Sequence, residues 1–484
     1  MDIPFVTLFR TPNAYYFYEV NKSEFVQIGE LSFRYLHELI INKSDITDSM
    51  PQELIDLKDS GYLATKSVVE EIQHFCSDFI DVFLDRKLDK ITLQLTQDCN
   101  FRCKYCVYSE NRNARQRRHS EKRMDWETAK KALDFFWDHS VDTAEVNIGF
   151  YGGEPLLEFP LIKQVVEYSK RRFSGKNLSF NITTNATLLT DEMIYYFRNH
   201  KVSVLISLDG PKEINDKNRV FSDGSGTFDA VLERISRIKE IAPEFADMVT
   251  INMTLDPEND YDCINSIQLE NEELQTLNMQ SFLVDFDYDD EPVKFSDEYA
   301  WKNEYHNFLA ALHYLNRFPK EDISPIAEKN ISRAFHDAVL IGNTSHLYKI
   351  DAPSGPCLPG QMRLFVDAYG KFFPCERISE TSAVMCIGSL ENGFNLDNVH
   401  KLLNIGRVAE DICKNCWCFR YCGLCAKKGD DGSEELSEKV KLFWCEGTRA
   451  SAYEKCRRYL LLTEIPVFYQ NQARNICKEG IDVI

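Results

Sequence analysis

The sequence lacks the usual marks of a membrane or secreted protein. Its 484 residues contain no apolar run of about 18 residues, which argues against a membrane-spanning helix. Residues 1–20 show no basic start followed by an apolar stretch, so no secretory signal is visible. A convincing internal repeat and a long low-complexity segment are also missing. We therefore expect a globular cytoplasmic protein.

Positive charge is scarce as well. The chain carries 56 Lys and Arg residues against 76 Asp and Glu residues, a formal net charge of -20. Binding to a phosphate backbone needs basic surface, so this balance argues against nucleic acid as a partner. Hydrophobic residues make up 44% and charged residues 27%, which predicts a large core rather than disorder. At roughly 150 residues per domain, the length suggests about three domains.

Cysteine, by contrast, is abundant. The chain has 16 cysteines, which in a reducing compartment indicate metal ligands before disulfides. Three lie close together at Cys99, Cys103 and Cys106, and ten lie from Cys357 to Cys456. This spacing predicts two separate metal regions.

Strand and helix patterns predict the organisation of the chain. Strands and helices alternate over 88–290, which predicts an α/β domain with a parallel sheet, closed or partly closed as a barrel. In such barrels chemistry takes place at the carboxyl ends of the strands. The predicted domains are 1–87 (an α+β module), 88–295 (the barrel), 296–345 (a helical connector), 346–456 (a loop-rich region stabilised by metal) and 457–484 (a C-terminal tail).

The N-terminal module is predicted from short aromatic strands within 1–30 and helical patterns at 31–41, 52–58 and 67–84. Two interpretations stay open. The module either packs against the rest of the chain or binds a peptide, taking an extended segment along a sheet edge.

The first cysteine group follows the predicted strand Ile91–Thr96 and reads Cys99-Asn100-Phe101-Arg102-Cys103-Lys104-Tyr105-Cys106. Three thiolates this close can hold three irons of a [4Fe–4S] cube and leave the fourth iron open. Structural zinc would require four protein ligands. The Cys-x3-Cys-x2-Cys spacing resembles the signature of the radical SAM superfamily. That resemblance implies a partial (β/α)6 TIM-like barrel and S-adenosylmethionine (SAM), which the reduced cluster cleaves to a 5′-deoxyadenosyl radical.

Further motifs resemble the same family in order. Tyr151-Gly152-Gly153-Glu154-Pro155 follows a predicted strand, and in the family this segment binds the amino group of SAM. The family places ribose and carboxylate contacts around the ends of the next two strands. Arg219 is a candidate for the SAM carboxylate or for a surface salt bridge, and two aromatic residues flank the adenine or shield the cluster. The implied cofactor contacts are Phe101, Tyr105, Gly152, Gly153, Glu154, Thr184, Asn185, Ser207, Asp209 and Arg219.

The second cysteine region resembles the SPASM extension. Cys357 and Cys375 flank Gly370, and a Cys-x2-Cys-x5-Cys-x2-Cys run then precedes Cys445; the family usually has three residues, not two, in the last gap. The resemblance implies two auxiliary [4Fe–4S] clusters and so three in all. One is assigned to Cys413, Cys416, Cys422 and Cys445, and the other to Cys357, Cys375 and Cys425.

Several ligand assignments stay open in this region. The fourth ligand of the Cys357 set is Cys386, Cys418 or the thiolate of a substrate. A zinc ribbon is the alternative to the auxiliary clusters. Four cysteines are predicted to be small buried hydrophobes instead: Cys76, Cys263, Cys456 and Cys477.

The segments Phe373–Arg377 and Cys413–Cys425 resemble maturases of cysteine-rich ribosomal peptides of the ranthipeptide or sactipeptide type. This resemblance implies thioether crosslinks from a Cys sulfur to a carbon, and a winged-helix-like recognition module at 1–87 for the leader of a Cys-rich precursor peptide. It also implies a low-potential electron donor such as ferredoxin or flavodoxin.

Two other functions are alternatives. An anaerobic sulfatase maturase, which forms formylglycine, usually has Asp after the equivalent of Cys375; here Glu376 stands there, a weak candidate for a catalytic base. A non-enzymatic iron–sulfur electron carrier leaves the SAM motifs unexplained. A basic run predicts either a solvated loop or a site for acidic peptide residues: Arg112, Arg115, Arg117, Arg118, Lys122 and Arg123.

Overall fold

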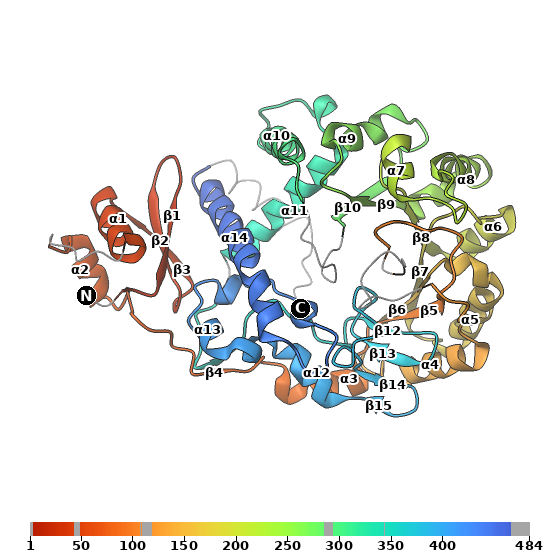
Figure 1. Ribbon diagram of the computed structural model, residues 1–484, viewed down its shortest axis with the longest axis horizontal. Helices are drawn as coiled ribbons and strands as arrows, with labels where there is room; N and C mark the ends of the chain where they lie inside the picture. The colour runs from red at the N-terminus through yellow and green to blue at the C-terminus, as the bar shows by residue number, and fades with distance from the viewer. Residues whose placement is uncertain are drawn as a thin grey trace.

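The computed structural model describes residues 3–42, 49–106, 108, 119–284, 294–342 and 344–465. An N-terminal module lies at one end of the molecule and the barrel at the other (Figure 1). Helix α14 (Glu438–Thr463) and the cysteine-rich region lie between them. Within the described residues, no helix combines the length and the apolar character needed to cross a membrane.

The barrel is built on a parallel sheet whose strands follow one another in chain order. Helices cover its outer face (Figure 1), and the α/β fold with a partial (β/α)6 barrel is thus confirmed. The strands are β5 (Lys90–Thr96), β6 (Glu145–Gly152), β7 (Asn177–Thr184), β8 (Val202–Ser207), β9 (Val249–Leu255) and β10 (Asn278–Leu283). The helices are α4 (Trp126–Asp138), α5 (Phe159–Arg172), α6 (Asp191–His200), α7 (Lys212–Asn218), α8 (Phe228–Ile241) and α9 (Tyr261–Glu270).

Local sequence explains these elements. Asp125 caps α4 by accepting a hydrogen bond from the Thr128 N–H at 2.7 Å. In β9, Val249, Ile251, Met253 and Leu255 are buried. The polar residues between them, Asn252 and Thr254, line the cavity inside the barrel. Because side chains alternate along a strand, one face of the sheet packs against the helices and the other faces the cavity.

The cysteine-rich region continues the same sheet. Strand β12 (Leu364–Val366) pairs in parallel with β5, opposite Ile91–Leu93. Strands β13 (Lys371–Phe373), β14 (Gly388–Ser389) and β15 (Gly393–Phe394) extend it antiparallel, and α12 (Leu396–Leu403) and α13 (Glu410–Lys414) follow. The hairpin that leads to Cys375 therefore lies beside the strand that leads to Cys99.

The N-terminal module contains the predicted short strands as one antiparallel sheet of order β1-β2-β3. Its elements are β1 (Val6–Arg10), β2 (Tyr15–Glu19), β3 (Glu24–Ile28), α1 (Glu30–His37) and α2 (Gln52–Asp59). The predicted connector is helical, with α10 (Asp297–Tyr314) and α11 (Pro325–Ile341).

The helix predicted over 67–84 is wrong for most of its length. The structure has a short strand there, β4 (Glu71–Ile72), and helix α3 begins only at Ile80 (Ile80–Arg86). The cause is long-range pairing: the Glu70 and Glu71 N–H groups donate to the Lys349 carbonyl, and β4 pairs with β11 (Ile350–Asp351). Phe75, which lies inside the predicted helix, is 83% exposed.

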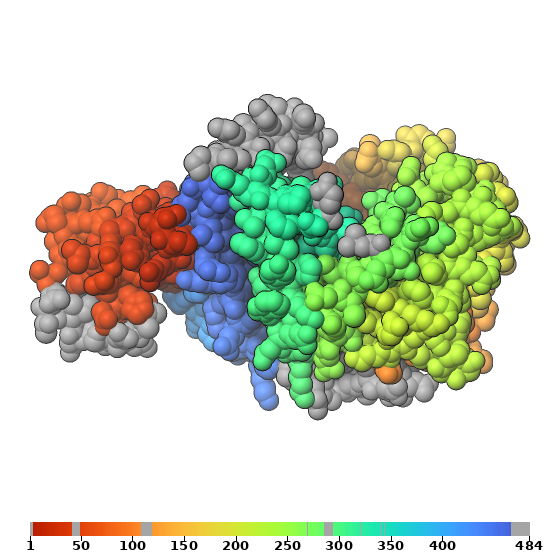
Figure 2. All heavy atoms as spheres, turned by 90° about the horizontal axis from the view of Figure 1, so that it is seen from above, coloured from red at the N-terminus to blue at the C-terminus, as the bar shows by residue number. Residues whose placement is uncertain are grey.

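The three-stranded sheet packs against α14 and the cysteine-rich region, where Figure 2 shows the module directly beside that helix. Phe9 is fully buried and stacks on Tyr453 of α14, with ring centroids 4.5 Å apart. Trp417 meets the edge of the same phenyl ring at 6.2 Å. Aromatic packing therefore joins the module to the rest of the protein.

Replacing Phe9 with Ala tests this interface. We expect the free energy of unfolding to fall by about 3–5 kcal/mol, because the change leaves a cavity among aromatic rings. Phe75→Ala, at an exposed phenylalanine, is the control and should change it by no more than about 0.5 kcal/mol. Thermal and denaturant unfolding measure both; equal effects would contradict the proposed packing.

Candidate functional site

A cavity of about 680 Å³ opens at the carboxyl ends of the barrel strands. It gathers residues from β5 to β10 and from the β12–β13 region. Almost all the cofactor contacts and cluster ligands predicted for the barrel line it: Cys99, Cys103, Cys106, Phe101, Tyr105, Gly152, Gly153, Glu154, Thr184, Asn185, Ser207 and Arg219. The structure thus brings together residues more than 100 positions apart.

Two glycines set the distance between the cysteine loop and the end of β6. The Gly153 N–H donates to the Thr96 carbonyl and the Glu154 N–H to the Asp98 carbonyl, each at 2.8 Å. A Cβ on Gly153 would lie 2.0 Å from the Asp98 oxygen, and Gly152 has a φ of +144°. Only glycine permits this approach, so both positions hold the cysteine loop against β6.

Glu154 is buried, and its carboxylate is occupied by the protein itself. It accepts hydrogen bonds from the Thr184 hydroxyl at 2.6 Å, from the Asn185 N–H at 2.8 Å and from the Leu156 N–H at 3.0 Å. Burial raises the pKa of Glu154 to about 7. The side chain therefore joins the ends of β6 and β7, and its contact with the amino group of SAM stays a prediction.

The three cysteines after β5 act on one another electrostatically, which places them in one group. Burial raises the pKa of Cys103 to about 12 and that of Cys99 higher still. Iron must therefore displace protons from these thiols when it binds. One buried thiol and two half-buried thiols at the wall of an open cavity fit a [4Fe–4S] cluster with one iron accessible to a small molecule.

Arg219 lies beside Asp209, which follows β8. The guanidinium Nε is 2.9 Å from the Asp209 carboxylate, and the Tyr105 hydroxyl donates to the same carboxylate. Arg219 thus has a partner inside the protein while it lines the cavity. Its role toward the SAM carboxylate stays a prediction. Phe101 is buried and meets Phe221 edge to face at 5.0 Å.

The structure places most of the remaining cysteines in two groups, and their assignment to two clusters stays a prediction. Burial raises the pKa of Cys375 to about 12, and the nearby thiols of Cys425 and Cys357 contribute to this rise. Around a separate small cavity lie Cys413, Cys416, Cys418, Cys422 and Cys445. Within the described residues, no three His, Cys, Asp or Glu side chains close around a single metal ion.

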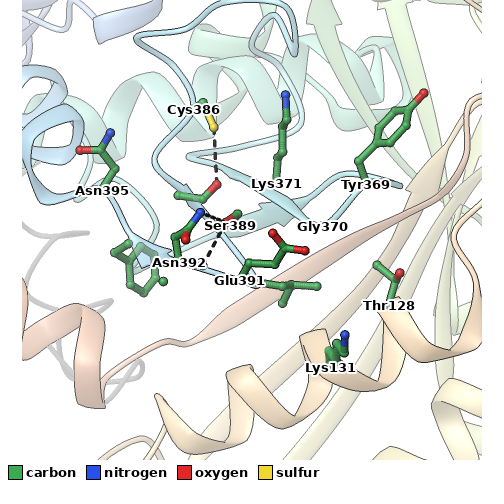
Figure 3. A pocket seen from close by; sticks show the side chains of 14 residues that line it. Thr128, Lys131, Tyr369, Gly370, Lys371, Cys386, Ser389, Glu391, Asn392 and Asn395 are labelled. Atoms are coloured by element: carbon green, nitrogen blue, oxygen red, sulfur yellow. Dashed lines mark hydrogen bonds between the residues drawn. The ribbon is translucent and has the colours of Figure 1, made fainter.

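Each of the two candidates for an extra ligand has a hydrogen-bond partner outside the Cys357 set. Cys386 lines a different cavity, opposite Thr128 and Lys131 of α4, and its thiol donates to the Gly388 carbonyl at 3.4 Å (Figure 3). Cys418 donates to Cys422 of the other set. Neither contact involves Cys357, Cys375 or Cys425.

The four cysteines expected to be buried hydrophobes divide. Cys76 and Cys456 are buried as predicted, but Cys263 is exposed, and that prediction was wrong because its side of α9 faces solvent. Cys477 lies outside the described residues, as do Arg112, Arg115, Arg117 and Arg118 of the basic run. Arg123 pairs with Glu158 at 2.6 Å, and the Lys122 ammonium lies over the Tyr369 ring.

Charged residues that the sequence analysis missed also line the large cavity. Lys90 donates to Asn181 at 3.1 Å, and burial lowers the pKa of this lysine. Arg363 forms an ion pair with Glu376 at 2.7 Å, and the Arg377 guanidinium lies over the Phe282 ring. The period of two along β5, β7 and β9, with polar residues at alternate positions, is the signal that predicts an inward-facing Lys90.

Comparison with known proteins agrees with this geometry. Residues 93–269 match the family model of the Radical SAM superfamily, so the barrel is a radical SAM domain. A serine-type anaerobic sulfatase-maturating enzyme of Bacteroides thetaiotaomicron is 32% identical over 32% of this chain and 37% of its own length. The radical SAM cyclopropyl synthase TigE of Paramaledivibacter caminithermalis is 27% identical over 70% of this chain and 68% of its own.

The solved structure of native anSMEcpe with bound AdoMet and Kp18Cys peptide shares the fold. Its TM-score is 0.55 at 17% identity, over 79% of this chain and 99% of that one. The chain spans less than half the length of two curated relatives that it matches at more than 30% identity, 43% and 37%.

Gly153→Ala tests the close approach of the two loops. We expect SAM affinity to fall by at least about tenfold, because the new methyl group must push the cysteine loop away from β6. Equilibrium binding of SAM to the iron-loaded protein measures this. Gly447→Ala is the control, since a Cβ there meets nothing within 4 Å; wild-type affinity in both variants would contradict the loop contact.

Proposed function

We propose that this chain, whose barrel is a radical SAM domain, is a peptide maturase that forms thioether bonds in a Cys-rich precursor peptide. A thioether joins the sulfur of a peptide Cys to a carbon of another residue. The reaction removes two hydrogens. One leaves as a hydrogen atom. The other leaves as a proton and an electron, and this released electron balances the one electron that SAM cleavage consumes.

The observation that carries this proposal is the set of three thiols Cys357, Cys375 and Cys425. With Cys386 and Cys418 directed elsewhere, a cluster held by this set has a position for a thiolate from outside the chain. Cys357 and Cys425 are exposed, which leaves room for that ligand. A peptide Cys bound there would be activated and held in place at the same time.

The location of this set supports the proposal further. Cys375 directly follows the β12–β13 hairpin, and its neighbour Glu376 lines the same cavity as Cys99 and Gly153. Arg363 and Arg377 line that wall too, and the ion pair with Arg363 orients Glu376. A peptide in the cavity would therefore lie between the SAM-binding loops and the auxiliary cysteines.

When bound, the cluster on Cys99, Cys103 and Cys106 supplies the electron that cleaves SAM. The chain's own residues provide the surroundings. Glu154 and the two glycines hold the loops together, and the polar side chains of β7 and β9 line the space for the peptide. A low-potential ferredoxin or flavodoxin is the proposed electron donor.

The N-terminal module is the proposed binding site for the leader of the precursor. Strand β3 lies at the edge of its sheet, and the side chains of Glu24 and Gln27 are exposed. The other edge strand, β1, begins beside Phe5, whose N–H already donates to Ala64. An extended peptide can add to β3 through backbone hydrogen bonds.

A second function is formylglycine formation from a Cys or Ser of a protein substrate. Glu376 favours it, because its carboxylate lines the cavity and has one buried oxygen without a partner. The ion pair with Arg363 argues against a free base at this position.

Mass spectrometry of a Cys-rich peptide after turnover tests the main proposal. We expect a loss of two hydrogens per crosslink, and the crosslinked Cys should resist thiol alkylation. The control is the same peptide with each Cys replaced by Ser. Formylglycine in place of a crosslink would favour the second function and contradict the first.

Gln27→Pro tests leader binding at β3. Proline removes a backbone donor from the edge strand, so leader affinity measured by fluorescence anisotropy should fall by at least about tenfold. Gln27→Ala keeps the backbone N–H and should bind as the wild type does. Uncoupled SAM cleavage should be unchanged in both variants, and unchanged leader affinity in Gln27→Pro would refute the proposed site.

A further inference from the structure

Helix α14 presents two cations to the cysteine set Cys413, Cys416, Cys422 and Cys445. Lys441, Cys445 and Arg449 follow one another at intervals of four residues, which puts them on one face of the helix. All three line the small cavity around that set. The helix therefore contributes a ligand and two positive charges to the same place.

Lys441 is bound to sulfur. Its side chain is 3% exposed, and its Nζ donates to the Cys413 Sγ at 2.8 Å. Within the described part of the chain, that ammonium pairs with no carboxylate. A buried cation is costly unless a group of negative charge accompanies it, and a thiolate cluster is such a group.

Arg449 acts on the same thiols. Burial raises the pKa of Cys445, whereas the charges of Lys441 and Arg449 oppose that rise. Cys416 also experiences the positive charge of Arg449. The two cations thus influence several members of the set.

We infer that Lys441 and Arg449 raise the reduction potential of the [4Fe–4S] cluster proposed for Cys413, Cys416, Cys422 and Cys445. The inference rests on the proposed function, which supplies that cluster. Reduction adds one negative charge, so nearby cations stabilise the reduced state more than the oxidised state. Net charge and hydrogen bonds to sulfur are known determinants of such potentials.

The other auxiliary set has a different environment. The thiol of Cys375 experiences the negative charge of Glu376, and that of Cys357 the positive charge of Arg363, which is itself paired with Glu376. Charges beside that set therefore largely cancel. We expect the cluster on α14 to be the more easily reduced of the two auxiliary clusters, which suits it for exchanging electrons with an external carrier.

The test is potentiometric titration, followed by electron paramagnetic resonance, of full-length protein with Cys99, Cys103 and Cys106 replaced by Ala. Only auxiliary signals remain in this background. Lys441→Met should lower one midpoint potential so that, at a fixed potential, the ratio of reduced to oxidised cluster falls at least tenfold, which is about 59 mV for one electron. Lys441→Arg should restore most of the shift.

Arg449→Gln provides an independent variant at a partly exposed position, and it should shift the same signal in the same direction. If Lys441→Met fails to retain iron, the midpoint potential of Arg449→Gln tests the inference instead. Lys439→Gln removes an exposed charge two residues away and is the control. If both auxiliary clusters are present and their potentials are unchanged in Lys441→Met and Arg449→Gln, the inference is overturned and the proposed function is not. Absence of auxiliary clusters in the parent protein would overturn the proposed function with it.

Discussion

The pairing of β12 with β5 is the contact on which the arrangement of the two cysteine-rich regions depends. It is parallel and joins Leu364–Val366 to Ile91–Leu93. The chain after β5 carries Cys99, Cys103 and Cys106, and the chain after β13 carries Cys375. Since β5 and β13 belong to one sheet, residues more than 250 positions apart in the sequence become neighbours at one cavity. Without this register, the loop that carries Cys99 and the loop that carries Cys375 would have no common wall.

A second connection runs through α14. Near its end, the Glu464 carboxylate accepts hydrogen bonds from the Tyr16 hydroxyl at 2.9 Å and from Thr11 at 2.5 Å, while Tyr453 stacks on Phe9. Farther back, the same helix carries Cys445 and Lys441. The N-terminal module and one cysteine set are therefore held by a single rigid element. A peptide bound at the module would act on a part of the molecule that also contributes ligands.

Much of the fold and the site could be predicted because the information is local. Cysteine spacing, the Gly152-Gly153 turn and the alternating strands are all read within a few residues. The helix over 67–84 failed because its residues pair with Lys349 and Asp351, which no local pattern reveals. The Arg363–Glu376 ion pair depends on where β12 docks. The Glu154 carboxylate accepts a hydrogen bond from Thr184, which lies at the end of a different strand, β7. Cys263 shows the same limit, since exposure depends on what covers a helix.

The central claim is that one chain holds a SAM-cleaving cluster and two auxiliary clusters. Iron and sulfide analysis of anaerobically reconstituted protein tests it most directly. Three [4Fe–4S] clusters predict about twelve irons and about twelve sulfides per chain, and replacing Cys99, Cys103 and Cys106 with Ala should remove about four of each. About four irons in the wild type, or tightly bound zinc in their place, would contradict the account.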